Sequence, residues 1–245
     1  MLNAVTFTPL QKTMFPGTEK FPFDIKVQLA DEDRSDVFAL RYRAYLDARY
    51  IERNAAATYH DRHDHLDSTV IISARDRGEL VGALRICMSH PWQQLDTLPC
   101  ASYYPELKAL KREAGGGIAE MSRLAIDPSI TNRSYRTTLY AALVRAGFIA
   151  ARAAGVSHIV IATKSDWIRF YEYMLGFKPV GQPALYPPGD IPITLLAGSI
   201  DQAASRQRMQ NAFFKITAAE IASMRQALKP ALQRPQIPAS TTTSA

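Results

Sequence analysis

Hydrophobic and polar positions alternate with two different periods along this chain, and each period predicts a type of element. FDIKVQL (23–29) alternates at every second residue, which is typical of a half-buried strand. The next apolar run, VFALRYRAYLDARYI (37–51), has the spacing of an amphipathic helix. Arg41 falls on the apolar face of that helix. A charged residue on such a face needs a partner, so a buried ion pair is expected there.

The middle of the chain predicts a hairpin, an insertion and a further strand. STVIISARD (68–76) and ELVGALRICM (79–88) are rich in β-forming residues and are separated by a short turn, which predicts an antiparallel hairpin. Residues 89–114 predict an insertion with one short helix near 104–112. GGGIAEMSRLAIDP (115–128) then combines a glycine-rich start, a strand and an Asp-Pro stop.

Strands and helices alternate through the second half. A long helix is predicted over 134–154, where apolar residues keep helical spacing until Gly155. HIVIAT (158–163) is a continuous apolar run typical of a central strand, and SDWIRFYEYMLGF (165–177) predicts a capped helix. The last predicted strands are KPVG and IPITLLAGSI. Because the hairpin must be antiparallel while strand–helix–strand crossovers favour parallel neighbours, this order predicts an α/β fold with a mixed sheet.

The length of 245 residues and a hydrophobic content of 47% suit one domain with tails. Two appended helices are predicted after the last strand, and the second opens with a capping box formed by Thr217 and Glu220. The predicted parts are an N-terminal arm (1–22), the domain (23–200), a C-terminal helical extension (201–229) and a disordered tail (230–245).

The charge balance favours an acidic partner. There are 29 basic and 23 acidic residues, giving a net charge of +6. Nucleic acid is not expected, because the basic residues are spread along the chain without a recognition motif. An acidic carrier protein or a polyphosphate cofactor fits the charge equally well. Two cysteines, Cys87 and Cys100, are too few for a disulfide framework and indicate a reducing compartment. No apolar run is long enough to span a bilayer, so a cytoplasmic location is expected.

The segment YHDRHDHLDS (59–68) contains three histidines and three aspartates, which are common metal ligands. The chain has no HExxH or CxxC motif, and the two remaining histidines stand alone. We therefore expect no metal site. Asp64 and Asp67 then require another role.

One long stretch resembles the GNAT superfamily of N-acyltransferases. HIVIATKSDWIRFYEYMLGFKPVG (158–181) is similar to the late strand, helix and "FYxxxGF" segment of that superfamily, and the helix from Ser134 stands where those enzymes place the helix after a pyrophosphate loop. The resemblance covers roughly residues 23–200. It implies the GNAT acyltransferase fold, an α/β fold with a central mixed, mostly antiparallel sheet flanked by helices, here with a C-terminal helical extension.

The chain departs from the superfamily at the phosphate-binding loop. RSYRTT (133–138) carries Arg136 and Thr138 where small residues normally let backbone amides approach a pyrophosphate, which makes coenzyme A a less suitable donor. A helix N-terminus with arginines still suits the single phosphate of a phosphopantetheine arm. The residues expected to hold that arm are Arg133, Ser134, Arg136 and Thr137.

Four short motifs resemble two branches of this fold, the acyl-homoserine-lactone synthases and the long-chain N-acyl amino acid synthases. RYRAY is similar to "RxxxF", DHLD to "DxxD", VGALR to "GxxR" and EMSR to "ExxR". The matched positions are Arg41, Tyr45, Asp64, Asp67, Arg85, Glu120 and Arg123. Three arginines and three carboxylates can satisfy one another if the fold brings them together. Such a network either pins the first helix to the sheet or also shapes an amine-substrate pocket, with an arginine available for a substrate carboxylate.

The resemblance also implies roles in attack of an amine on a thioester. Glu120 would remove the amine proton, directly or through a water, or would serve only as a structural partner of an arginine. Tyr171 would protonate the leaving thiol, or would only pack in the core. Backbone amides would stabilise the oxyanion. The residues expected to supply them are Met121, Ser122, Arg123 and Leu124.

The leading functional prediction is a long-chain N-acyl amino acid synthase, of the N-acyltyrosine synthase type, that acylates the α-amine of an amino acid from acyl carrier protein and holds no bound cofactor. An acyl-homoserine-lactone synthase using S-adenosylmethionine is the alternative; those enzymes usually have a Trp soon after the early helix, and DARYIERNAAATYH (47–60) has none. Further alternatives are an acetyl-CoA acetyltransferase and a non-catalytic binding module. The basic residues either contact the carrier or form a solvated face; they are Lys108, Lys111, Arg112, Arg133 and Arg136.

Overall fold

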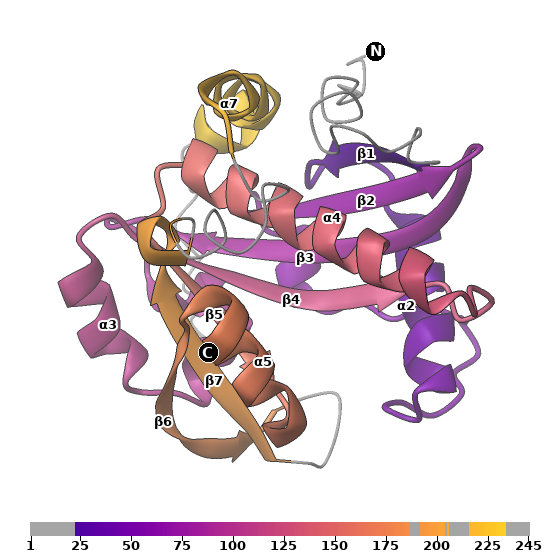
Figure 1. The fold of residues 1–245 in the computed structure, drawn as a ribbon, viewed down its shortest axis with the longest axis horizontal. Coiled ribbons are helices and arrows are strands. Elements are labelled where there is room, and N and C mark those ends of the chain that lie inside the picture. Colours follow the sequence, from indigo (N-terminus) through magenta and orange to yellow (C-terminus); the bar gives the residue numbers. More distant parts are fainter. Residues whose placement is uncertain (1–22, 187–191, 204, 206–215, 234–245) are drawn as a thin grey trace, which may run out of the picture.

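The computed structural model describes residues 23–186, 192–203, 205 and 216–233. Its strands form one seven-stranded sheet in the order β1-β2-β3-β4-β5-β7-β6 (Figure 1). The strands are β1 (Phe23–Gln28), β2 (Thr69–Asp76), β3 (Glu79–Ser89), β4 (Ile118–Ile126), β5 (His158–Thr163), β6 (Lys178–Leu185) and β7 (Pro192–Ser199). Within the described ranges β4 and β5 are the parallel pair and the other neighbours are antiparallel. The predicted mixed, mostly antiparallel sheet is confirmed.

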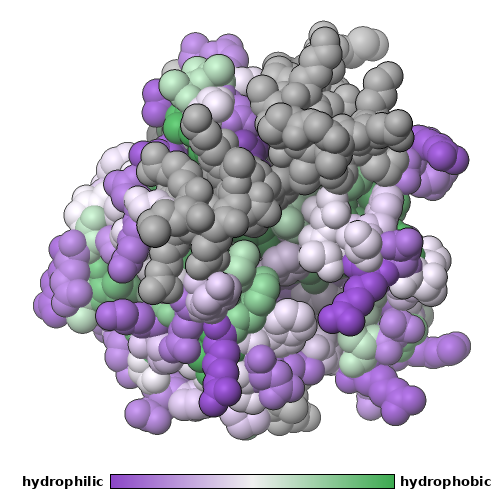
Figure 2. Space-filling model, viewed as in Figure 1, coloured by the Kyte–Doolittle hydropathy of each residue, from purple (hydrophilic) through white to green (hydrophobic). Residues whose placement is uncertain are grey.

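The helices cover both faces of this sheet. They are α2 (Ser35–Asp47), α3 (Leu107–Ala114), α4 (Arg133–Ala153), α5 (Ser165–Leu175) and α7 (Ala218–Gln233), with short 3-10 turns η1 (Arg62–His65), η2 (Leu95–Thr97) and η3 (Pro99–Ser102). Helix α4 crosses one face and packs with α7 in the main hydrophobic core, while α2 packs on the opposite face (Figure 1). On the face seen in Figure 2, hydrophilic side chains gather at the periphery and apolar ones show toward the centre.

Helix α7 is attached to α4 through a buried ion pair. Arg145 donates to both carboxylate oxygens of Glu220 at 2.8 and 3.0 Å. The Glu220 backbone amide also bonds the Thr217 hydroxyl at 3.2 Å, and the Thr217 amide bonds the Glu220 carboxylate at 2.8 Å, which confirms the predicted capping box. The helix continues past the predicted boundary at Lys229 to Gln233. The other appended helix was predicted over 205–216, which lies largely outside the described residues.

The strands β4 and β5 separate part of the way along the sheet. Their parallel pairing runs from Ile118↔His158 to Met121↔Ile161, and beyond that point β4 pairs with β3 while β5 pairs with β7. A bulge follows at once in β4, where the register with β3 shifts and Arg123 takes a positive φ of 55°. The sheet therefore opens beside a bulged strand.

Candidate active site

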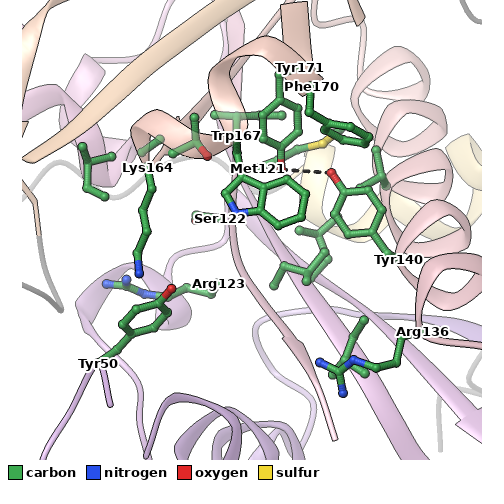
Figure 3. A pocket seen from close by; sticks show the side chains of 18 of the residues that line it. Tyr50, Met121, Ser122, Arg123, Arg136, Tyr140, Lys164, Trp167, Phe170 and Tyr171 are labelled. Atoms are coloured by element: carbon green, nitrogen blue, oxygen red, sulfur yellow. Dashed lines mark hydrogen bonds between the residues drawn. The ribbon is translucent and has the colours of Figure 1, made fainter. Parts of the chain in front are cut away.

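A cavity of about 930 Å³ lies where β4 and β5 separate (Figure 3). Its wall contains all four residues predicted to supply oxyanion amides, which are Met121, Ser122, Arg123 and Leu124. Helix α4 contributes Tyr140 and the arginines at its N-terminus, and α5 contributes Trp167 and Tyr171. The bulge turns this part of β4 out of the regular ladder, so its backbone amides can serve a group in the cavity.

A buried ion network lies beside the cavity and includes the three predicted arginines. Arg41 contacts both oxygens of Asp64 at 3.0 and 2.9 Å, and Arg85 contacts Asp64 at 3.1 Å; all three side chains are fully buried. Asp61 contacts Arg85 at 2.8 Å and Arg123 at 2.9 Å. The arginine on the apolar face of the first helix thus has its expected partner.

Asp61, which the sequence pattern did not single out, contacts two arginines of the network. It caps the 3-10 turn η1, since its carboxylate accepts from the backbone amide of His63 at 2.9 Å, and Asp64 bonds back to the Asp61 amide at 2.9 Å. A 3-10 turn stacks residues three apart, which brings these two aspartates together. The segment contains two overlapping DxxD spacings, Asp61–Asp64 and Asp64–Asp67. The sequence alone does not show which pair contacts the arginines.

The arginines keep both aspartates ionised. Burial alone would raise the pKa of Asp64, but Arg41 and Arg85 outweigh it and the pKa lies below its ordinary value. Burial likewise opposes ionisation of Asp61, and its bond to His63 together with Arg85 and Arg123 lowers the pKa well below the ordinary range. The network is therefore charged at neutral pH.

Glu120 lies close to this network but bonds elsewhere. Its side chain is fully buried in an apolar cluster and is not part of the cavity wall. One carboxylate oxygen accepts from the backbone amide of Cys100 at 2.8 Å, and the other accepts from the hydroxyl of Tyr186 at 2.8 Å. Tyr186 does line the cavity. Direct removal of a substrate proton by Glu120 therefore does not fit this geometry, because Tyr186 stands between the carboxylate and the cavity.

Tyr171 lines the cavity and is bonded to a second tyrosine. The hydroxyl of Tyr140, on α4, donates to the hydroxyl of Tyr171, on α5, at 2.9 Å (Figure 3). Burial raises the pKa of both phenols, so both keep their protons at neutral pH. This placement is compatible with the expected role of Tyr171 as a proton donor, and Tyr140 holds its oxygen in place.

The N-terminus of α4 forms another part of the cavity. Arg133, Arg136 and Thr137 line it, and Ser134 is exposed nearby. The Arg136 guanidinium donates to the carbonyl oxygens of Asp127 and Ile130 at 3.2 and 3.0 Å. Its side chain therefore braces the loop in which related folds need small residues.

The basic residues predicted to contact a carrier do not form one surface. Lys108, Lys111 and Arg112 belong to α3, which lies at the opposite end of the molecule from the N-terminus of α4 (Figure 1). The Lys111 ammonium is also used internally, since it bonds the Ser89 hydroxyl at 2.7 Å and the Gln93 carbonyl. The sequence did not reveal that these residues lie far apart, because the position of the insertion on the fold could not be inferred from it.

The histidines of the segment 59–68 bond to protein groups. His63 lies near Asp61 and the carbonyl of Asp96, at 3.3 and 3.2 Å, and His60 lies 3.3 Å from His65. In the part of the chain that is described, no group of three metal-ligating side chains is arranged to hold an ion. The same part contains no helix long and apolar enough to cross a membrane.

Lys164 and Tyr50 are site residues that the sequence did not indicate. The Lys164 ammonium lies 4.1 Å from the centre of the Tyr50 ring, and both line the cavity with Arg123 (Figure 3). Lys164 directly precedes α5 and Tyr50 follows α2, so neither belongs to a motif with a recognisable spacing. Two cations and an aromatic ring nevertheless share this region of the wall.

The fold is that of a group of acyl-transferring synthases. The chain is similar to the structure of FeeM, an N-acyl amino acid synthase from uncultured soil microbes, with a TM-score of 0.60, 18% identity, and coverage of 77% of this chain and 95% of that one. It is also similar to the acyl-homoserine-lactone synthase LasI (TM-score 0.55, 15% identity, 75% and 94% coverage). The CoA-dependent acyl-homoserine lactone synthase BjaI, solved with SAM and isopentyl-CoA, gives a TM-score of 0.51 at 17% identity, with 83% and 88% coverage. The predicted GNAT-type acyltransferase fold is confirmed.

The family follows from the sequence. The family model of the N-acyl amino acid synthase FeeM matches residues 36–199, which is most of the chain. No curated protein matches the chain. The chain belongs to the FeeM family of N-acyl amino acid synthases and is an N-acyltransferase. This finding excludes the non-catalytic binding module.

Proposed function

We propose that this enzyme transfers a long-chain acyl group from the phosphopantetheine arm of acyl carrier protein to the α-amine of an amino acid. The observation that carries the proposal is the cavity between the separated strands, which joins an α4 N-terminus rich in arginine to a region that contains Arg123 and Lys164. A thioester carbonyl between these regions would lie beside the bulged amides of β4.

The donor assignment rests on the loop before α4. The Arg136 side chain donates hydrogen bonds to two loop carbonyls. A pyrophosphate would therefore have less room to approach the backbone here than it has at a glycine-rich loop. The single phosphate of a phosphopantetheine arm needs fewer contacts, and the exposed Arg133 is placed at the cavity rim to supply one. An acidic carrier also suits the net charge of +6.

The acceptor assignment rests on the cationic part of the wall. Arg123 and Lys164 would attract the carboxylate of an amino acid, and the Tyr50 ring would pack against the rest of the molecule. Oriented in this way, the α-amine would face the thioester carbon. Amides of the Ser122–Leu124 segment would stabilise the oxyanion, and Tyr171 would protonate the departing thiolate.

The test is mass spectrometry of products formed by the purified enzyme. Palmitoyl-loaded carrier protein and palmitoyl-CoA are supplied in separate reactions, each with the twenty amino acids and S-adenosylmethionine, and heat-inactivated enzyme is the control. We expect an N-palmitoyl amino acid from the carrier. A lactone would overturn the acceptor assignment, and equal or faster turnover with the CoA thioester would overturn the donor assignment.

A further inference from the structure

A cavity-facing tyrosine connects the cavity to the only buried carboxylate of β4. Glu120 is fully buried, and Tyr186 is 7% exposed and lines the cavity. The Tyr186 hydroxyl donates to one oxygen of Glu120 at 2.8 Å, while the Cys100 amide fixes the other oxygen at 2.8 Å. Both oxygens are thus held, and one of them is bonded by a phenol whose residue lines the cavity.

Burying the carboxylate of Glu120 in its surroundings costs folding free energy. Glu120 pairs across the sheet with Cys87 and Val160. Its hydrogen bonds to described residues come from Cys100 and Tyr186, and the charge of Arg85 also acts on it. A carboxylate in such surroundings is expensive to bury, and an apolar side chain of similar size would pack there without that cost. The arrangement therefore suits a proton acceptor better than a structural link.

The geometry points to Tyr186 as a proton relay between the acceptor amine and Glu120. This inference rests on the proposed function and adds a catalytic residue to it. As the amine nitrogen bonds to the thioester carbon, its proton passes to the phenolic oxygen of Tyr186, and the phenolic proton passes to Glu120. The carbon–sulfur bond then breaks, the electron pair leaves with sulfur, and the thiolate takes a proton from Tyr171. Tyr171 is then a phenolate, and Glu120 returns its proton through Tyr186 and solvent to that phenolate, which restores the starting state.

The environment of Tyr186 suits this role. Burial and the adjacent carboxylate raise the pKa of the phenol, so it keeps its proton until another arrives from the substrate. Its hydroxyl is held by Glu120 at 2.8 Å, and its ring packs edge-on against Tyr103, with centroids 5.2 Å apart. A phenol held in this way transfers protons without becoming a stable phenolate.

The experiment compares Tyr186→Phe with Tyr103→Phe as the matched control, because Tyr103 packs on the same ring but is not in the relay. With carrier thioester and the best acceptor, we expect Tyr186→Phe to lower kcat about 100-fold at pH 7 while the acceptor KM stays unchanged. The deficit should shrink as the pH rises, because hydroxide can then take the proton that the attacking amine loses and the relay is needed less. Tyr103→Phe should keep the wild-type rate.

A double variant separates a relay from two independent effects. Glu120→Gln should show the same pH-dependent deficit, and Glu120→Gln/Tyr186→Phe should be no slower than the slower single variant, because one path has been cut twice. A wild-type rate for Tyr186→Phe, a deficit of equal size at every pH, or multiplicative losses in the double variant would overturn the relay. Wild-type enzyme that forms no acylated amine with any acceptor would instead overturn the proposed function. If Tyr186→Phe does not fold, Glu120→Gln alone decides, since its pH-dependent deficit is also required.

Discussion

Replacing Asp64 by asparagine measures how much the buried ion network stabilises the fold. Asp64 holds Arg41 at 3.0 and 2.9 Å and Arg85 at 3.1 Å, and all three side chains are fully buried. Asparagine keeps the shape and removes the charge, so Arg41 loses the carboxylate that neutralises it, while Arg85 keeps its ion pair with Asp61 and its bond to Ser122. Loss of one partner of a buried ion pair costs about 3–5 kcal/mol. At about 2–4 °C per kcal/mol for a domain of this size, Tm should fall by roughly 6–20 °C.

Urea unfolding followed by circular dichroism gives the free-energy change, provided that the m-value stays the same. Asp47→Asn, an exposed carboxylate on α2, is the control and should shift the free energy of unfolding by no more than about 0.5 kcal/mol. Equal midpoints for the Asp64 and Asp47 variants would show that the network contributes no stability, and the reasoning from burial would be refuted.

The pH dependence provides a second measure of the same network. The pKa of Asp64 is lowered in the folded state because Arg41 and Arg85 outweigh burial. Such a group stabilises the fold above its unfolded-state pKa of about 3.9, and this stabilisation is lost as the pH falls toward the folded-state pKa. Wild-type stability should therefore fall below about pH 5 with a steeper slope than that of Asp64→Asn. Parallel curves would contradict the assignment.

Four further predictions concern single contacts. Lys164→Met should raise the acceptor KM about 10- to 100-fold, the loss expected for one charge-assisted hydrogen bond, as initial-rate kinetics would show. Tyr171→Phe should lower kcat about 100-fold, and Tyr140→Phe should lower it less because the donor oxygen remains; single-turnover assays separate the two. Glu220→Leu should destabilise the fold by about 3 kcal/mol and make α7 a site of early proteolysis. Arg133→Ala should raise the carrier KM and reduce its dependence on salt, measured between low and physiological ionic strength.

The order of elements could be predicted because each strand and helix has a clear period. The hairpin of β2 and β3, the long α4 and the final capping box all follow from local patterns of apolar residues, glycines and caps. The partner of Arg41 was also predictable in kind, since a charge on a buried helix face requires one. Local patterns thus determined the framework and the chemical nature of the network.

Long-range geometry decided the rest. Tyr186 and Glu120 are 66 residues apart, and Tyr186 directly follows β6, which pairs with β7 in the same sheet. In a regular strand the side chain of Arg123 would lie on the opposite face of the sheet from that of Arg85, because Arg85 pairs with the residue before Arg123. The bulge returns the Arg123 side chain to Asp61. The bulge could not be predicted from the sequence, because it lies at a residue that is not glycine and no other residue type indicates it.

The bulge at Arg123 connects the two roles considered for the ion network, which are to pin the first helix to the sheet and to shape the cavity. A non-glycine residue in the left-handed region costs about 1–2 kcal/mol, and Arg123 has a φ of 55° there. Its guanidinium is held by Asp61 at 2.9 Å and lies 5.3 Å from the centre of the Tyr59 ring, and these contacts can offset that cost. The same residue lines the cavity. Under the proposed function, the contact that anchors the arginine would also fix the direction of the amides beside the thioester carbonyl, so that pinning the first helix to the sheet and shaping the cavity would be one effect.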